Sequence, residues 1–213
     1  MRIGNLERET HGRSATLKRF CDAWINRMAE YRKAVPEDWW PFEYGERSLV
    51  GFFAAGIWDV NGVCIEEFQS HDKVRMRDGK KEKFRGRGDL YVRHGKTESN
   101  IEFKVRQIGL SKRGDHEETV RKHWRASQKD ARRSHQTGIN TFAGIFVLPY
   151  VRDGTAVKTC EENLRQLLRC VWDTVKPDAM AWWCPIKDAL KNEWGWDDPV
   201  VGVILVVKSV RSA

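Results

Sequence analysis

The chain has 213 residues, of which 40% are hydrophobic, enough to bury one sizeable core. No apolar run approaches the ~20 residues of a membrane-spanning helix, and the polar residues 1–16 contain no apolar signal core. We therefore expect a cytoplasmic protein without a membrane partner. The net charge of +8 favours a polyanionic partner, chiefly nucleic acid.

The first predicted element is an amphipathic helix over residues 14–34. Its apolar side chains recur at spacings of three and four, and Ser14 is a suitable N-terminal cap. Pro36 and Pro41 then interrupt the chain. We expect residues 1–42 to form a helical N-terminal extension.

Residues 43–213 are expected to form one α/β domain, because helix and strand patterns alternate along them. The expected class is a mixed β-sheet flanked by helices. The predicted elements are a helix at about 43–58, a strand from Gly62, a hairpin at 87–105, a helix at about 115–135, a strand at 141–151, a helix at about 160–175 and strands at 179–186 and 200–207.

The predicted hairpin, RGDLYVRHGKTESNIEFKV, carries charges at unusual positions. Apolar and polar residues alternate on both sides of a Gly-Lys turn, and positions equidistant from the turn face each other. Asp89 is then opposite Glu102 and shares a face with Glu102 and Lys104. Opposed carboxylates destabilise a sheet unless a cation such as Mg²⁺ joins them. A solvated face with an incidental ion pair is the alternative interpretation.

Glu46 adds a third carboxylate from the second helix. It falls within ~60° of Leu49 on the helix wheel, toward the stripe that Phe53 and Ile57 continue. An inward carboxylate is costly unless it is paired or coordinated, which favours a metal ligand. The alternative is a negative charge in the first helical turn, where it is favourable.

These motifs resemble the PD-(D/E)XK nuclease superfamily. The resemblance rests on GRGDLYV (residues 86–92), on IEFKV (residues 101–105), on Glu46, and on the order helix, three strands, helix, strand over residues 43–150. It implies a restriction-endonuclease-like αβββαβ core. Gly88 stands where the family has proline.

The resemblance also implies roles for individual residues. Asp89, Glu102 and Glu46 would be catalytic ligands of Mg²⁺ or Mn²⁺, and Lys104 would be the catalytic lysine. Gln107 would line the same site, although an ordinary polar strand end explains it as well. The sequence leaves open whether the protein is a homodimer, as many members of the superfamily are.

Two basic segments are candidate phosphate-binding surfaces. Residues 70–88 are expected to form a basic loop with a turn at Asp78-Gly79, in which Arg85 and Arg87 precede the hairpin. The predicted helix at 115–135 places six cations on the arc opposite its apolar seam, where nucleic acid would bind: Arg121, Lys122, Arg125, Lys129, Arg132 and Arg133. A merely solvated helix face is the alternative interpretation.

The sequence as a whole predicts a metal-dependent nuclease that hydrolyses phosphodiester bonds, with DNA favoured over RNA as the substrate. Two alternatives use the same fold. One is a catalytically inactive nucleic-acid-binding module, and the other is an interaction or assembly protein.

Overall fold

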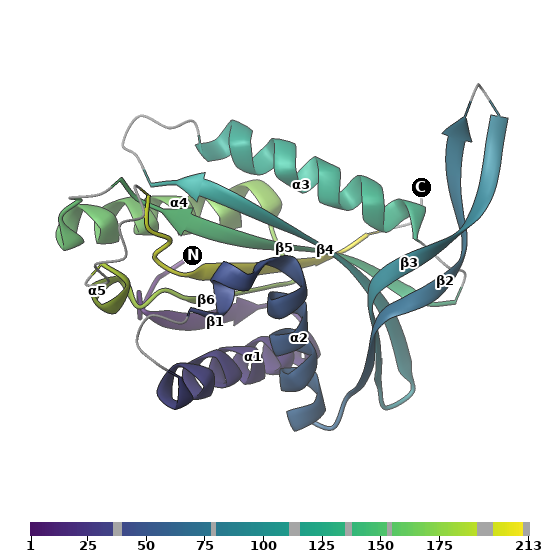
Figure 1. Ribbon diagram of the computed structural model, residues 1–213, viewed down its shortest axis with the longest axis horizontal. Coiled ribbons are helices and arrows are strands. Elements are labelled where there is room, and N and C mark those ends of the chain that lie inside the picture. Colours follow the sequence, from purple (N-terminus) through teal and green to yellow (C-terminus); the bar gives the residue numbers. More distant parts are fainter. Residues whose placement is uncertain are drawn as a thin grey trace.

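The computed structural model is an α/β protein with a seven-stranded mixed sheet of order β1-β6-β7-β5-β4-β3-β2 (Figure 1). It describes residues 1–35, 40–77, 80–110, 116–134, 138–152, 155–190 and 198–210, without the side chains of residues 43, 44 and 69–87. The elements are β1 (Arg8–Gly12), α1 (Ala15–Ala34), a 3₁₀ turn (Pro41–Tyr44), α2 (Gly45–Asp59), β2 (Val63–Arg77), β3 (Lys80–His94), β4 (Thr97–Gly109), α3 (His116–Arg133), β5 (Asn140–Tyr150), α4 (Val157–Val175), β6 (Ala179–Trp183), α5 (Ile186–Ala189) and β7 (Val203–Ser209).

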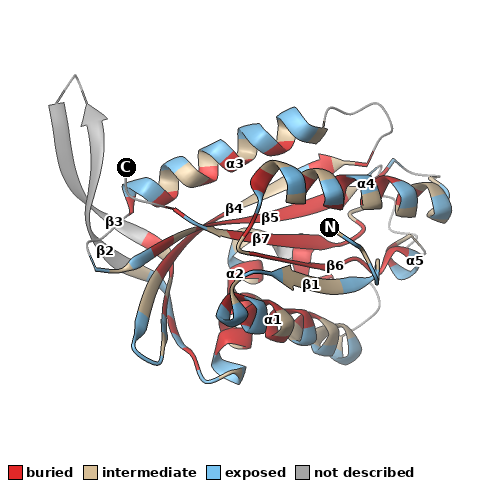
Figure 2. Cartoon of the chain, turned by 180° about the vertical axis from the view of Figure 1, so that it is seen from behind, coloured by how far each residue is buried: buried red, intermediate tan, exposed pale blue. Residues whose placement is uncertain are grey.

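Helices cover both faces of the sheet. In Figure 1, α1 and α2 lie on one face, and α3 and α4 lie on the other. The strands between these layers, β5, β6 and β7, are almost wholly buried (Figure 2). On the α1–α2 face, the stacked rings of Phe103 and Phe146 lie 4.9 Å apart and contact Phe53 and Trp24. The α1–α2 face of β4 and β5 is therefore closely packed.

The helix predicted at 14–34 is confirmed as α1. Its cap is also confirmed, because the Ser14 hydroxyl accepts a hydrogen bond from the N–H of Leu17 at 3.3 Å. The sequence did not reveal β1, which pairs antiparallel with β6. Residues 1–42 therefore contribute a strand to the sheet as well as a helix. The helix α1 packs closely on α2, where a Cβ on Gly56 would lie 2.7 Å from the N of Trp24.

The hairpin of β3 and β4 has the predicted register. Its paired positions run from His94↔Thr97 to Leu90↔Ile101. Gly95 takes φ 61° at the first position of the turn, a conformation that glycine adopts without strain. The alternation of the sequence and the turn residues were sufficient to fix this register.

The prediction of a loop over residues 70–88 is wrong. The strands β2 and β3 form a long antiparallel hairpin whose pairing continues to Arg77↔Lys80. The signal was in the sequence, since Val74 and Met76 alternate with basic residues before an Asp-Gly pair, which is typical of a hairpin. The charges of the segment obscured it. The expected turn at Asp78-Gly79 and the side chains of Arg85 and Arg87 lie outside the described residues.

The later elements agree with the sequence in type and order. The helices α3 and α4 and the strands β5 and β6 occupy the predicted segments, and β7 begins three residues later than predicted. Trp40, Trp182 and Trp183 are at most 3% exposed and serve core packing. Within the described part of the chain, no helix has both the length and the apolar character needed to cross a membrane.

Candidate active site

The site lies where β3 separates from β4. The last pair between these strands is Leu90↔Ile101, whereas β4 continues alongside β5 as far as Gly109. In the hairpin, alternate N–H groups of β4 point toward β3. Beyond Ile101 those of Phe103 and Val105 consequently face an edge from which the neighbouring strand has departed.

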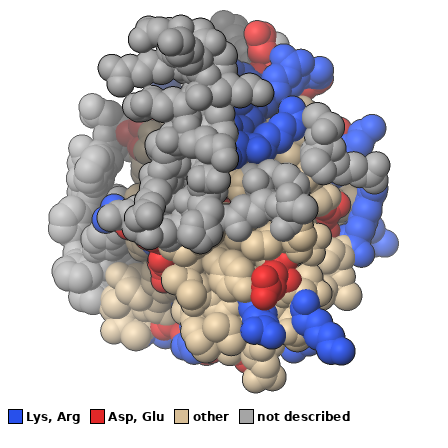
Figure 3. Space-filling model, turned by 90° about the vertical axis from the view of Figure 1, so that its right-hand side faces the viewer, with Lys and Arg blue, Asp and Glu red and all other residues tan. Residues whose placement is uncertain are grey.

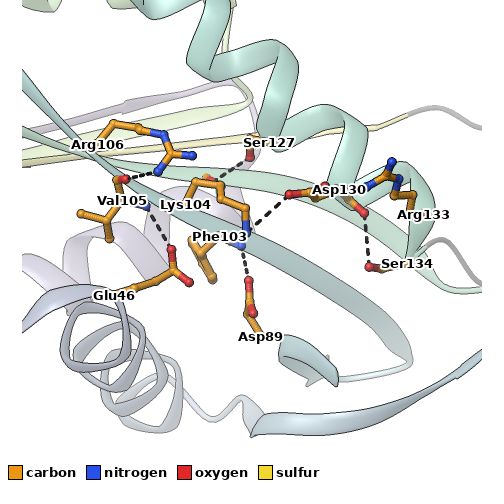
Figure 4. A network of polar contacts seen from close by, with 11 residues as sticks. Glu46, Asp89, Phe103, Lys104, Val105, Arg106, Ser127, Asp130, Arg133 and Ser134 are labelled. Carbon is orange, nitrogen blue, oxygen red and sulfur yellow. Dashed lines mark hydrogen bonds and ion pairs between the residues drawn. The ribbon is translucent and has the colours of Figure 1, made fainter. Parts of the chain in front are cut away.

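Side chains take the place of the missing strand. The Asp89 carboxylate accepts a hydrogen bond from the N–H of Phe103 at 2.7 Å, and the Glu46 carboxylate accepts one from the N–H of Val105 at 3.1 Å. The Arg106 guanidinium donates to the carbonyl of Val105 at 2.8 Å. Figure 4 shows Glu46 and Asp89 on the same side of β4. Residues from α2, β3 and β4 therefore cap one short stretch of open edge.

The position of Glu46 follows from the packing of α2. Glu46 lies in the first turn of this helix, and Phe53, two turns later, contacts the ring of Phe103 at 5.7 Å between ring centres. The predicted inward stripe of Leu49, Phe53 and Ile57 is fully buried. Since that stripe anchors α2 over β4, Glu46 is brought to the strand edge, half-buried.

The electrostatics show that Glu46, Asp89 and Lys104 are neighbours. Burial raises the pKa of Glu46 above its ordinary value, Lys104 opposes that shift, and the negative charge of Asp89 adds to it. The hydrogen bond from Val105 and the charge of Arg106 lower the pKa by smaller amounts. Two carboxylates are therefore held close together, and the nearby positive charges offset the unfavourable effects on Glu46 only in part.

Lys104 projects toward α3. Its Nζ lies 3.6 Å from Oδ2 of Asp130, whose other oxygen is 3.4 Å from Nη1 of Arg133 (Figure 4). The Lys104 side chain is 25% exposed, so its ammonium is accessible to solvent at the margin of the site. The lysine consequently lies between the carboxylates at the edge of β4 and a carboxylate on α3.

Glu102 is placed differently from the other predicted ligands. It is 4% exposed and shares with Lys104 the face of β4 that α3 covers. Asp89, in contrast, reaches the N–H of Phe103 at the edge of the strand. Among the side chains that the structure describes, no group of three or more Asp, Glu, His or Cys is arranged to hold a metal ion. The structure thus brings Glu46 and Asp89 together at the edge of β4 and places Glu102 on the face that α3 covers.

Gln107 is exposed at the far end of the open edge. Strand alternation puts its side chain on the opposite face of β4 from Lys104. It therefore takes no part in the network of Asp89, Glu46 and Lys104 that the described residues form.

The basic face of α3 is exposed as predicted. Val120, Trp124, Ser127 and Ala131 form the buried seam. All six predicted cations are exposed: Arg121, Lys122, Arg125, Lys129, Arg132 and Arg133. Figure 3 shows Lys and Arg side chains gathered in the upper part of one face of the molecule, at the height of α3. The C-terminal half of this helix is the part nearest to Lys104, through Asp130.

Sequence reasoning missed Asp130 and Arg106 as members of the site. Arg106 was discoverable, because it lies two residues after Lys104 on the same face of a predicted strand. Asp130 was not, since only the packing of α3 on the sheet determines which flank of the helix faces β4.

Comparisons of the chain with protein-family models, with curated proteins and with solved structures gave no match. The chemistry of the site is therefore argued from its own residues.

Proposed function

We propose that the protein is a metal-dependent nuclease that hydrolyses phosphodiester bonds of nucleic acid, with DNA the favoured substrate. The proposal includes a restriction-endonuclease-like fold of the PD-(D/E)XK type, which the order α2, β2, β3, β4, α3, β5 supports. The observation that carries it is the pair of carboxylates, Asp89 and Glu46, held beside Lys104 at the open edge of β4.

The residues present fit a divalent cation such as Mg²⁺ or Mn²⁺. The second oxygens of Asp89 and Glu46 accept no hydrogen bond from the described residues. Mg²⁺ is commonly held by one or two carboxylates together with water and substrate phosphate. A cation here would also stabilise the ionised form of Glu46, whose pKa is raised by burial and, less strongly, by the charge of Asp89. Asp89 and Glu46 would hold the ion, and Glu102 is the further candidate on the adjacent face.

Such an ion supplies an activated water and neutralises charge on the phosphate. The protein's own contribution begins with the backbone of β4, whose N–H groups at Phe103 and Val105 fix the two carboxylates. Lys104 supplies a positive charge to the non-bridging phosphate oxygens as charge develops on them. Asp130 keeps the Lys104 ammonium directed toward α3 in the free protein.

The exposed cations of α3 would position the substrate. Phosphate contacts orient a nucleic acid without reading its sequence, and lysine and arginine make most of them. Because Asp130 links α3 to Lys104, a backbone that follows the C-terminal half of this helix would pass the open edge of β4.

Cleavage of labelled single- and double-stranded DNA and RNA, with Mg²⁺, Mn²⁺ or EDTA, tests the proposal. We expect metal-dependent cleavage that falls by about 10²–10³-fold in Lys104→Ala and at least as far in Asp89→Asn. The introduced amide retains an oxygen that can accept from the N–H of Phe103, so the fold should survive the second change. Lys158→Ala and Asp173→Asn on the exposed side of α4 are the matched controls and should cleave normally.

Wild-type protein that cleaves no substrate under any of these conditions would refute the nuclease proposal. Salt-sensitive retention of nucleic acid by such an inactive protein would identify a binding module instead. Absence of both cleavage and retention would favour an interaction protein.

A further inference from the structure

A second group of cations lies farther along β4 than Lys104. Arg106 follows Lys104 by two residues and lies on the same face of the strand. Together with His123 of α3, it borders a cavity of about 10 Å³ between the sheet and the helices α3 and α4. Val120, Ile145 and Val147 form part of the apolar lining. Two basic side chains, one from each element, therefore meet above an apolar floor.

The two charged groups that shift the pKa of His123 are both positive. Burial lowers the pKa of His123, and Arg106 from β4 and Lys122 from α3 lower it further. No carboxylate among the described residues counts among its influences. Arg106 also acts on Glu46 at the strand edge, where it lowers the pKa of that carboxylate. An anion bound between Arg106 and Lys122 would therefore oppose both positive charges and favour the imidazolium form of His123.

Arg106 is oriented in advance. Its Nη1 donates to the carbonyl of Val105 at 2.8 Å, which fixes the guanidinium at the open edge of β4. The remaining N–H groups have no acceptor among the described residues. A fixed guanidinium with unused donors is well suited to phosphate, which it can bind through two parallel hydrogen bonds.

We propose that Arg106, His123 and Lys122 form a binding subsite for one phosphodiester group of a nucleic acid, adjacent to the phosphate at Lys104. Residues two apart on a strand are separated by about 6.6 Å, close to one nucleotide step of an extended backbone. The identification of the polyanion rests on the proposed nuclease function. Binding of the phosphate itself requires neither metal nor cleavage.

The test is a nuclear magnetic resonance titration of the histidine side chains in EDTA, with and without a short oligothymidylate. Its phosphodiesters do not titrate near neutral pH, and His123→Gln assigns the resonance. We expect the pKa of His123 to rise by about 1 unit on binding, because a nearby anion favours the imidazolium. The rise should disappear in Arg106→Ala, and oligothymidylate affinity should fall by about tenfold.

Arg106→Lys provides a second variant if Arg106→Ala destabilises the edge of β4. It keeps the charge but loses paired hydrogen bonding, so we expect a smaller rise in the pKa of His123 and a weaker affinity. Lys158→Ala is the control, since Lys158 is exposed on α4 and belongs to neither β4 nor the basic face of α3. At saturating oligothymidylate it should leave the rise at His123 unchanged.

A His123 resonance that does not respond to saturating oligothymidylate would overturn the subsite. This outcome is separable from failure of the nuclease proposal. Cleavage without a response at His123 would refute the subsite alone, whereas a response at His123 without cleavage would support the subsite and refute the nuclease.

Discussion

The two halves of β4 lie on one continuous strand but have different neighbours. Residues 97–101 pair with β3, and from Ser99 onward they pair with β5 as well, whereas residues 102–109 pair with β5 alone. In the first half, the backbone N–H groups directed toward β3 bond to that strand. In the second half, Asp89 and Glu46 accept hydrogen bonds from Phe103 and Val105.

This difference shows how a sheet creates a site without added elements. An open strand edge presents unpaired N–H groups at a fixed spacing, and native proteins cover such edges. Here the cover is two carboxylates, which are fixed close together despite their mutual repulsion. Because β3 separates from β4, backbone N–H groups that would otherwise bond to a neighbouring strand instead hold two carboxylates in place.

The largest expected effects come from proline substitutions in the two halves of β4. Ser99→Pro removes an N–H from the doubly paired half, and we expect it to lower the free energy of unfolding by about 3 kcal/mol or more. Val105→Pro removes an N–H that only Glu46 uses, and should cost about 1–2 kcal/mol. Denaturant unfolding measures both values.

Val105→Pro should nevertheless impair cleavage, because Glu46 loses the donor that holds it. Equal destabilisation by the two prolines would show that the open edge is not distinct from the paired one.

Metal binding gives the next largest effect. A ligand at 100 times its Kd stabilises the native state by about 2.7 kcal/mol, which corresponds to a Tm rise of about 5–10 °C in a chain of this size. We expect Mg²⁺ to produce such a rise in the wild type, and EDTA to reverse it. Asp89→Asn should abolish the rise while leaving the Tm in EDTA nearly unchanged. A rise that persists in Asp89→Asn would place the ion elsewhere.

The two flanks of α3 provide a comparison within the basic face. On a helix wheel, Lys122 and Arg133 lie within ~80° of Asp130, whereas Arg121 and Arg132 lie ~160° or more away. Since Asp130 faces Lys104, the first pair should contact substrate phosphates. The double variant Lys122→Ala/Arg133→Ala should reduce the slope of log K against log salt by about 1.8. Arg121→Ala/Arg132→Ala should change it less, as filter binding at several salt concentrations would reveal.

The smallest effect concerns Glu46 and pH. The pKa of Glu46 is raised in the folded protein, chiefly by burial, so its ionisation costs stability as the pH rises through that pKa. Glu46→Gln should therefore raise the Tm by about 1–2 °C at pH 7 in EDTA. The difference should vanish below about pH 4, where Glu46 is protonated in both folded and unfolded states. Calorimetry at both pH values checks this, and a lower Tm for Glu46→Gln at pH 7 would contradict it.

The hairpin of β3 and β4 and the helix α3 show what local sequence patterns can predict. The register of β3 and β4 followed from alternation about a Gly-Lys turn, and the exposed cations of α3 followed from its 3.6-residue period. The inward position of Glu46 followed from the apolar stripe of α2. The same reasoning failed over residues 70–88, where charge density concealed a strand alternation.

The sequence by itself determined the order of the main helices and strands from α1 onward, the register of the β3–β4 hairpin, the buried faces of the helices and the presence of Asp89, Glu46 and Lys104 near one strand. Only the tertiary structure decided that β3 and β4 stop pairing beyond Leu90↔Ile101, that Asp89 and Glu46 bind the exposed backbone of β4, and that Glu102 is buried on the face of β4 that α3 covers. Sequence periodicity predicts the face of a helix or strand on which a side chain lies, because that direction depends on the local backbone alone. The separation of two strands and the approach of α3 depend on the packing of segments distant in sequence, which no local pattern encodes.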